Sequence, residues 1–430
     1  MFQAIPLSLG QLSVWHDIRD LPPARRHEPN NAAVWTLPPG TGVHQARGAL
    51  GTLARRHPSL RTRYDLTDPD APRQLPADEA ATAVLDQVEA DPGDPGQADA
   101  VAAELAARPF DLGSEHGWRA RLLTHGDTAR ALVFVKHHIV ADAWAQELLR
   151  VQLSQALAVT APAPTAEAPA PGPAELAAEQ FSEAGLGRQA AALRHWERLH
   201  TDTPRTALPH RPADRGTALQ ATLRSAPALA AARVLADRAG VSVACVVLAA
   251  YARSVARLCA DGRAEPEALT VQLMSANRFT PRWKGLVTSM NQWAPALLPL
   301  PPATNLVGLA RAANWSSLTA FRHGMHDVTA VARLRDRAAA PEPTCAYNFV
   351  ALPEGAAAAA AGTGPEPGDQ SPALRWETPF TTIGPRCYAR ADDIDGVLSV
   401  RLTVRDLGRD QVAALLWDLH ARLLTEGKTA

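Results

Sequence analysis

The chain has 430 residues, 46% of them hydrophobic and 20% charged, a composition typical of a globular enzyme with more than one domain. Its formal net charge is -1, with 43 basic against 44 acidic side chains. This balance argues against nucleic acid or an anionic membrane as a partner. We expect no membrane span, because no run approaches about 18 apolar residues. The N-terminus has no basic region followed by a long apolar core, so no secretory signal is expected either.

The four cysteines are scattered along the chain and form no C-x-x-C pair. They are Cys245, Cys259, Cys345 and Cys387. A disulfide framework or a zinc site is therefore not expected. We expect reduced, buried thiols in a cytoplasmic protein that carries no metal.

Three compositionally biased stretches organise the chain. Alternating proline and alanine at 160–174 cannot hold a helix and predicts an extended linker. This linker separates an N-terminal lobe, 1–165, from a C-terminal lobe, 175–430. An alanine run flanked by glycine and proline at 355–373 predicts a long surface insertion, and 91–100 predicts a smaller loop.

Helical and strand patterns alternate through the first lobe. Apolar residues recur at helical spacing from Val43 to His57, and a short strand is expected from Arg61 to Asp65. The apolar run from Ala131 to Lys136 is short enough for a buried strand. A helix with one apolar stripe is expected to follow it, from Ala143 to Leu157.

The second lobe shows the same mixture. Helices are expected from Val241 to Leu258 and from Asp410 to Leu424. Strands are expected over 269–273, 294–300 and 397–404, the last with strict alternation of apolar and polar residues. Strands and helices mixed in both halves indicate two α/β lobes.

The most informative segment is HHIVADAW, residues 137–144, which lies between the expected strand and the expected helix. His138 therefore falls on a turn between two rigid elements. The unperturbed pKa of histidine, about 6.5, suits a general base near neutral pH. Such a base needs a second group to hold its surroundings in place, and Asp142 is close enough along the chain to order the turn.

Other interpretations of these residues stay open. A metal site is one, although adjacent residues on extended backbone point to opposite faces, so His137 and His138 would not easily share an ion. A purely structural histidine pair is another. Asp142 taken alone is more typical of a helix N-cap than of a catalytic group. The chain has no nucleophile elbow, phosphate-binding loop or dinucleotide-binding glycine pattern.

The pattern H-H-x-x-x-D followed by a small residue resembles the signature of condensation domains of nonribosomal peptide synthesis. It also resembles that of wider acyltransferases with the chloramphenicol-acetyltransferase-like fold. Other segments resemble the remaining family motifs, in the expected order and spacing, over nearly the whole chain. They are Ser8–Trp15, Arg56–Tyr64, Pro109–Leu112 with Arg119, His195–Trp196, Asn277–Arg278, and Gly285–Val287 with Asn291.

The resemblance implies a role for each motif residue. His138 corresponds to the catalytic second histidine and His137 to the first, which is usually structural. Asp142 corresponds to the aspartate that orders the motif loop. Arg278 corresponds to its salt-bridge partner across the lobes. Asn291 corresponds to the asparagine of the strand that follows and is a candidate substrate-binding residue.

The chain departs from the family pattern at two positions. Ala143 stands where glycine is usual, and its methyl group partly blocks a close backbone approach, which bears on the shape of the channel. Pro58 stands where glutamate is usual. Trp144 favours the condensation subgroup over the epimerisation subgroup, and the two intact histidines exclude the heterocyclisation subgroup.

The resemblance implies an α/β fold of two chloramphenicol-acetyltransferase-like lobes in a V-shaped pseudo-dimer with a tunnel between them. The implied reaction moves an acyl or aminoacyl group from a phosphopantetheine thioester on a carrier protein to an amine or hydroxyl. The product is an amide or an ester, and the nucleophile is a small molecule or carrier-bound. The enzyme needs no bound cofactor, because the pantetheine arm arrives with the carrier.

The chain contains no adenylation or carrier segment. We therefore expect a free-standing enzyme that meets its acyl- or peptidyl-carrier protein in trans. Two alternatives stay open: a non-catalytic recruitment module of the same fold, and an acyltransferase of that fold that uses soluble acyl-CoA.

Overall fold

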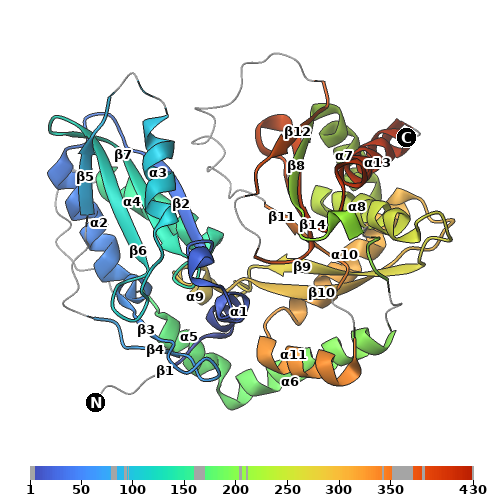
Figure 1. Ribbon diagram of the computed structural model, residues 1–430, viewed down its shortest axis with the longest axis horizontal. Helices are drawn as coiled ribbons and strands as arrows, with labels where there is room; N and C mark the ends of the chain where they lie inside the picture. Colours follow the sequence, from blue (N-terminus) through green and yellow to red (C-terminus); the bar gives the residue numbers. More distant parts are fainter. Residues whose placement is uncertain are drawn as a thin grey trace. The chain divides into compact units, whose positions relative to one another are not determined.

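The computed structural model describes residues 5–78, 85–91, 94, 96–158, 170–202, 206–209, 212–340, 343–350, 371–379 and 383–428 (Figure 1). The chain divides into two compact units. Unit 1 comprises Met1–Gln189, Ala276–Gln292 and Asp327–Thr329, and unit 2 comprises Ala190–Ser275, Trp293–His326 and Ala330–Ala430.

The units differ from the lobes expected from the sequence in one respect that bears on the site. The segment 276–292 belongs to unit 1, although it lies far beyond the expected linker. Most of that linker, 160–169, lies outside the described residues. Its last two residues begin a helix, α5 (Pro173–Gln180), because a proline is well accommodated at the first position of a helix.

Unit 1 is built on a four-stranded sheet with the order β2-β7-β6-β5. Strand β7 runs antiparallel to both of its neighbours, and β5 runs parallel to β6. A three-stranded sheet, β1-β4-β3, lies in the same unit. The elements are β1 (Ile5–Pro6), α1 (Leu9–Ile18), β2 (Asn30–Thr36), α2 (Val43–Arg56), β3 (Tyr64–Asp65), β4 (Arg73–Gln74), β5 (Leu85–Glu89), α3 (Gln97–Ala107), β6 (Trp118–His125), β7 (Thr128–His137), α4 (Ala143–Ala158) and α9 (Pro281–Lys284).

Strand β7 is buried on both faces. Leu132 and Phe134 pack into a core shared with α2 and α4, whereas Val133 and Val135 pack into a second core shared with α3. Helices on both faces leave no side of this strand for water. This explains why its sequence is a continuous apolar run and not an alternating one.

Unit 2 holds a seven-stranded sheet with the order β10-β9-β11-β13-β14-β8-β12. Helices α7, α8, α10 and α13 contribute to a single apolar core with this sheet. The elements are β8 (Ala218–Ser225), α7 (Ala226–Ala239), α8 (Val243–Ala260), β9 (Ala268–Ser275), β10 (Gln292–Pro299), α10 (Leu306–Arg322), α11 (Val328–Ala338), β11 (Cys345–Phe349), β12 (Ala373–Glu377), β13 (Cys387–Asp392), β14 (Leu398–Arg405) and α13 (Arg409–Lys428). Helix α6 (Glu183–Asp202) contains the boundary between the units.

Most of the elements expected from the sequence are present, and the alternation along β14 places every second residue in the core. Two expectations were wrong. The strand expected from Arg61 to Asp65 is limited to the two residues of β3, because Pro58–Arg61 forms a turn of 3-10 helix. The loop expected at 91–100 ends at Gly96, where α3 begins. The insertion expected at 355–373 lies outside the described residues apart from its last three.

Helix α8 corrects a further expectation. Its 18 residues have a mean hydropathy of 1.6, so in length and composition this helix resembles a membrane span, contrary to the expectation that no segment does. However, 72% of it is buried inside the protein. A buried core helix meets the same criteria, and α8 contributes many residues to the apolar core of unit 2.

Candidate active site around His138

The motif histidines lie where β7 ends. The backbone N–H of His137 donates to the carbonyl of Gly117 on one side, at 2.8 Å, and that of His138 donates to Pro29 on the other, at 2.9 Å. The Val140 N–H then closes a turn onto the His137 carbonyl, at 3.0 Å. Sheet pairing therefore persists up to His138, which gives the two imidazoles fixed and different surroundings.

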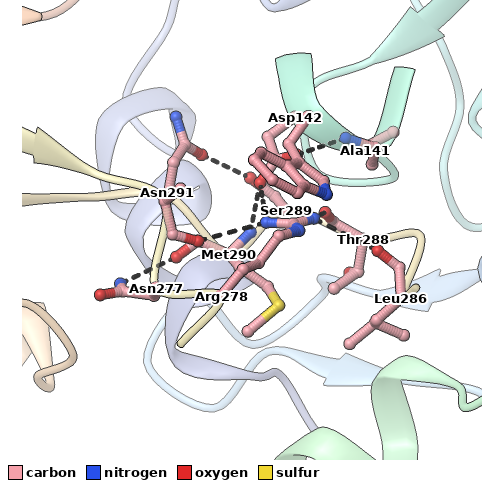
Figure 2. A network of polar contacts seen from close by, with 12 residues as sticks. Ala141, Asp142, Asn277, Arg278, Leu286, Thr288, Ser289, Met290 and Asn291 are labelled. Carbon is pink, nitrogen blue, oxygen red and sulfur yellow. Dashed lines mark hydrogen bonds and ion pairs between the residues drawn. The ribbon is translucent and has the colours of Figure 1, made fainter. Parts of the chain in front are cut away.

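Asp142 closes the turn and starts the next helix. Its Oδ1 accepts from the Ala145 N–H at 2.9 Å, which makes it the N-cap of α4. Its Oδ2 accepts from Arg278 Nη1 at 2.7 Å and from the Met290 N–H at 3.0 Å (Figure 2). Both side chains of the ion pair are almost completely buried, 3% exposed for Asp142 and 1% for Arg278. Asp142 thus has both expected roles: the N-cap that its sequence position suggested and the ion pair that the family resemblance implied.

Arg278 also binds backbone carbonyls, in addition to Asp142. Its Nη2 donates to the carbonyls of Thr288 and Leu286, at 3.0 and 3.3 Å, and its Nη1 also donates to Ala276. Figure 2 shows Arg278 between Asp142 and the residues Leu286 and Thr288. The expectation of an ion pair is confirmed. The expectation that it bridges two lobes is wrong, because 276–292 is part of unit 1 and the pair lies within that unit.

Further contacts hold 276–292 in unit 1. The Trp144 indole N–H donates to the Lys284 carbonyl at 3.0 Å. Gly10 of α1 lies against the segment so closely that a Cβ there would come within 2.6 Å of Met290 Cα and closer still to the Ser289 carbonyl. Only glycine fits such a backbone approach. Ala143, which replaces the usual glycine, is exposed at the first position of α4.

Ser289 and Asn291 lie beside the second histidine. Ser289 Oγ donates to Asn291 Oδ1 at 3.1 Å and lies 3.5 Å from Nδ1 of His138. With its hydroxyl donating to the asparagine, the serine oxygen can accept from an Nδ1–H on His138. This arrangement favours the tautomer that leaves the Nε2 lone pair available as a base. The structure thus places Asn291 one side chain away from His138.

The electrostatics of the site keep both histidines neutral. Burial and the neighbouring Lys136 ammonium lower the pKa of His138 to about 4. The pKa of His137 is lowered to about 3, mainly by burial and to a smaller extent by the nearby His138 and Lys136. Burial also lowers the pKa of Lys136 to about 8, although Asp142 opposes that shift. Burial would raise the pKa of Asp142, but the Arg278 charge and the amide donors outweigh burial and hold the pKa below its usual value.

The other motif segments of unit 1 support the turn. Ser59 Oγ donates to the Val140 carbonyl at 2.8 Å, and His57 pairs with Gln152 of α4 at 2.6 Å. Lys136 is 2% exposed, and its Nζ donates to the Ala141 carbonyl at 2.5 Å. These contacts hold the turn in place from segments that are distant from it in the sequence.

Sequence reasoning missed three residues of the site. Ser289 had a weak signal, since it precedes Asn291 by two positions. Gly10 lies inside a recognised motif, but its contact with Ser289 depends on folding. Lys136 was interpreted as the polar end of a strand, and nothing local reveals that it is buried. The His195–Trp196 motif lies elsewhere, in unit 2.

The ion pair yields a stability prediction. Asp142→Asn and Arg278→Ala should each lower the free energy of unfolding by about 3–5 kcal/mol, because each leaves a buried charge unpaired. The double variant should cost less than the sum of the two, as measured by urea unfolding. Costs that simply add would contradict a direct pairing.

The stabilisation that this ion pair provides should also depend on pH in the acid range. The folded pKa of Asp142 is depressed, so its contribution is present above about pH 4, the ordinary carboxyl value, and is lost as the pH falls through the folded value.

The chain resembles known proteins in both sequence and fold. The family model described as "Condensation domain" matches residues 20–264, more than half of the chain. Cyclosporin synthetase of Tolypocladium inflatum is 34% identical over 133 residues, which are 29% of this chain and 1% of the synthetase. The chain therefore spans only a small part of that relative.

Two solved structures are similar over nearly the whole chain. A structure on condensation domain-mediated chain release from the enacyloxin polyketide synthase matches with a TM-score of 0.75 and 22% identity, covering 97% of this chain and 81% of that one. The X-domain in complex with OxyB from teicoplanin biosynthesis matches with a TM-score of 0.72 and 19% identity, covering 99% and 94%. At these identities the structures establish the shared fold, and the family model establishes membership: the chain belongs to the condensation-domain family.

Proposed function

We propose that this chain transfers an acyl or aminoacyl group from a phosphopantetheine thioester on a carrier protein to an amine or hydroxyl nucleophile. The observation that carries the proposal is His138, which lies neutral at the end of a buried strand with Nδ1 directed to Ser289 and Nε2 left as a base. We place the reaction in the cytoplasm, a location that the four free cysteines support.

In the proposed step, the nucleophile attacks the thioester carbonyl while Nε2 of His138 accepts its proton. A bond to the carbonyl carbon forms, and the tetrahedral intermediate then collapses with cleavage of the carbon–sulfur bond. The proton passes from His138 to the departing pantetheine thiolate, so the histidine returns to its neutral form. A weak base is sufficient here because the thioester is already activated and much of the rate comes from positioning.

Asp142 and Arg278 act in this proposal as positioning residues. Their buried pair holds the turn that carries His138 next to the segment that carries Ser289 and Asn291. His137 holds the turn from the other side, since its Nδ1 accepts from the Ile139 N–H at 3.1 Å. The protein binds no cofactor of its own in this scheme, because the carrier, acting in trans, brings the pantetheine arm.

A non-catalytic recruitment module is the second candidate. Two observations favour it: Ala143 in place of the usual glycine, and the close fold match to an X-domain whose solved structure contains a partner protein. The intact pair of neutral histidines, with Ser289 and Asn291 alongside, favours catalysis. Experiments on turnover separate the two.

Replacing the base gives the first test. His138→Ala should reduce product formation by about 10²–10⁴-fold, the usual contribution of a general base, with little change in melting temperature. Product would be quantified by mass spectrometry with a carrier-bound donor. His125→Ala, an exposed histidine of the same unit, is the matched control and should keep parental turnover. Near-parental turnover by His138→Ala would exclude the proposed base.

The lowered pKa of His138 sets the pH profile. The neutral form is the active one, so the single-turnover rate should stay level from about pH 6 to 8 and fall only as the pH approaches about 4. Lys136→Met removes the nearby positive charge, which should raise the pKa of His138 and move the acidic limb to higher pH. Circular dichroism at each pH controls for unfolding. A parental limb near pH 6.5, the ordinary histidine value, would contradict this electrostatic picture.

The third test concerns the donor. One acyl group loaded on its carrier should react with higher catalytic efficiency than the same group on CoA or a short pantetheine mimic, because docking raises the effective concentration of the thioester. Equal efficiency with CoA would favour a soluble-donor acyltransferase. No turnover with any donor would favour the recruitment module.

A further inference from the structure

The first motif histidine faces a cavity that the proposed reaction does not use. This cavity has a volume of about 580 Å³, lies wholly within unit 1, and is bounded by α1, the chain that follows it, the β3 region and the loop at 110–113. His137 is part of its wall, and His138 is not. The volume falls within the usual range of small-molecule sites, about 300–1,000 Å³.

The wall of the cavity combines apolar side chains with polar and charged ones, and His137 is a buried polar group among them. Trp15, Ile18, Leu66 and Phe110 are among the apolar side chains that line it. His137 is 97% buried, since 3% of its surface is exposed, and the edge of its ring meets Phe110 at a centroid distance of 6.4 Å. Ligand-binding pockets typically combine apolar side chains with polar groups that fix the orientation of the ligand.

The hydrogen bonds of His137 define what this polar feature offers. Its Nδ1 accepts from the Ile139 backbone N–H, so this nitrogen carries no proton. The proton of the neutral ring therefore resides on Nε2. Among the described residues no acceptor pairs with this N–H. His137 lines the cavity, so a ligand acceptor there could pair with this N–H.

The charges around the cavity balance. Arg19 and Arg26 contribute two positive charges, and Asp65 and Asp111 contribute two negative ones. Both carboxylates also have partners of their own, Thr67 for Asp65 and Ser114 for Asp111. The lining therefore favours neither an anion nor a cation, and a neutral ligand is the best match.

We propose that this cavity binds a neutral molecule with an apolar acyl tail and a carbonyl oxygen, which accepts a hydrogen bond from Nε2 of His137. The tail would occupy the space beside Trp15, Leu66 and Phe110. Because the other nitrogen of the same ring holds the Ile139 amide, a bound ligand would also steady the turn before Asp142. This inference does not depend on acyl transfer, since it concerns the opposite histidine and can be tested by binding alone.

The test is titration of octanamide into the full chain by isothermal calorimetry. We expect saturable binding by the parent. His137→Phe should bind about tenfold more weakly, which is the cost of one hydrogen bond. Octanoate and octylammonium should both bind more weakly than octanamide. Hydrogen exchange of the Ile139 amide should slow when octanamide is added, a response that binding at a distant site would not produce.

Filling the cavity provides the decisive comparison. Leu66→Trp should abolish binding, and Thr67→Trp at the exposed rim serves the same purpose if the first variant unfolds. Leu318→Trp, the same change at an exposed position of α10, is the matched control and should bind like the parent. Absence of binding by the parent, or parental affinity in a folded cavity-filled variant, would overturn the proposal.

Discussion

The buried carboxylate of Asp142 organises the site. It accepts hydrogen bonds from three sources: the first turn of α4, the Arg278 guanidinium and the Met290 amide. Helix, turn and the distant segment 276–292 therefore meet at one side chain. A charge removed from water in this way is tolerated only when its partners are complete, so the geometry at this point has little freedom.

The positive charge of Arg278 is matched in turn by backbone carbonyls. It binds the oxygens of Ala276, Leu286 and Thr288, which are three points along the returning segment. One arginine thus shapes the loop that presents Ser289 and Asn291. Gly10 provides the space on the opposite side, where any side chain would collide with the backbone of Ser289 and Met290.

Adjacent histidines have separate environments because strand geometry sends them to opposite faces. His138 meets the hydroxyl of Ser289, and His137 meets a cavity lined by aromatic and aliphatic side chains. Lys136 acts on both electrostatically, since its buried ammonium disfavours a second positive charge nearby. Two neutral imidazoles follow, one beside Ser289 and the other on the wall of the cavity.

Local sequence determined the elements and the position of the motif within them. The apolar run before His137 dictated a buried strand, and Asp142 three residues before Ala145 dictated a helix cap. Family resemblance supplied the pairing of Asp142 with Arg278. Tertiary structure decided that this pair lies within unit 1, that Ser289 lies beside His138, and that Lys136 is buried. These depend on chain segments about 130 to 150 residues apart, or on burial, and neither periodicity nor spacing encodes such contacts.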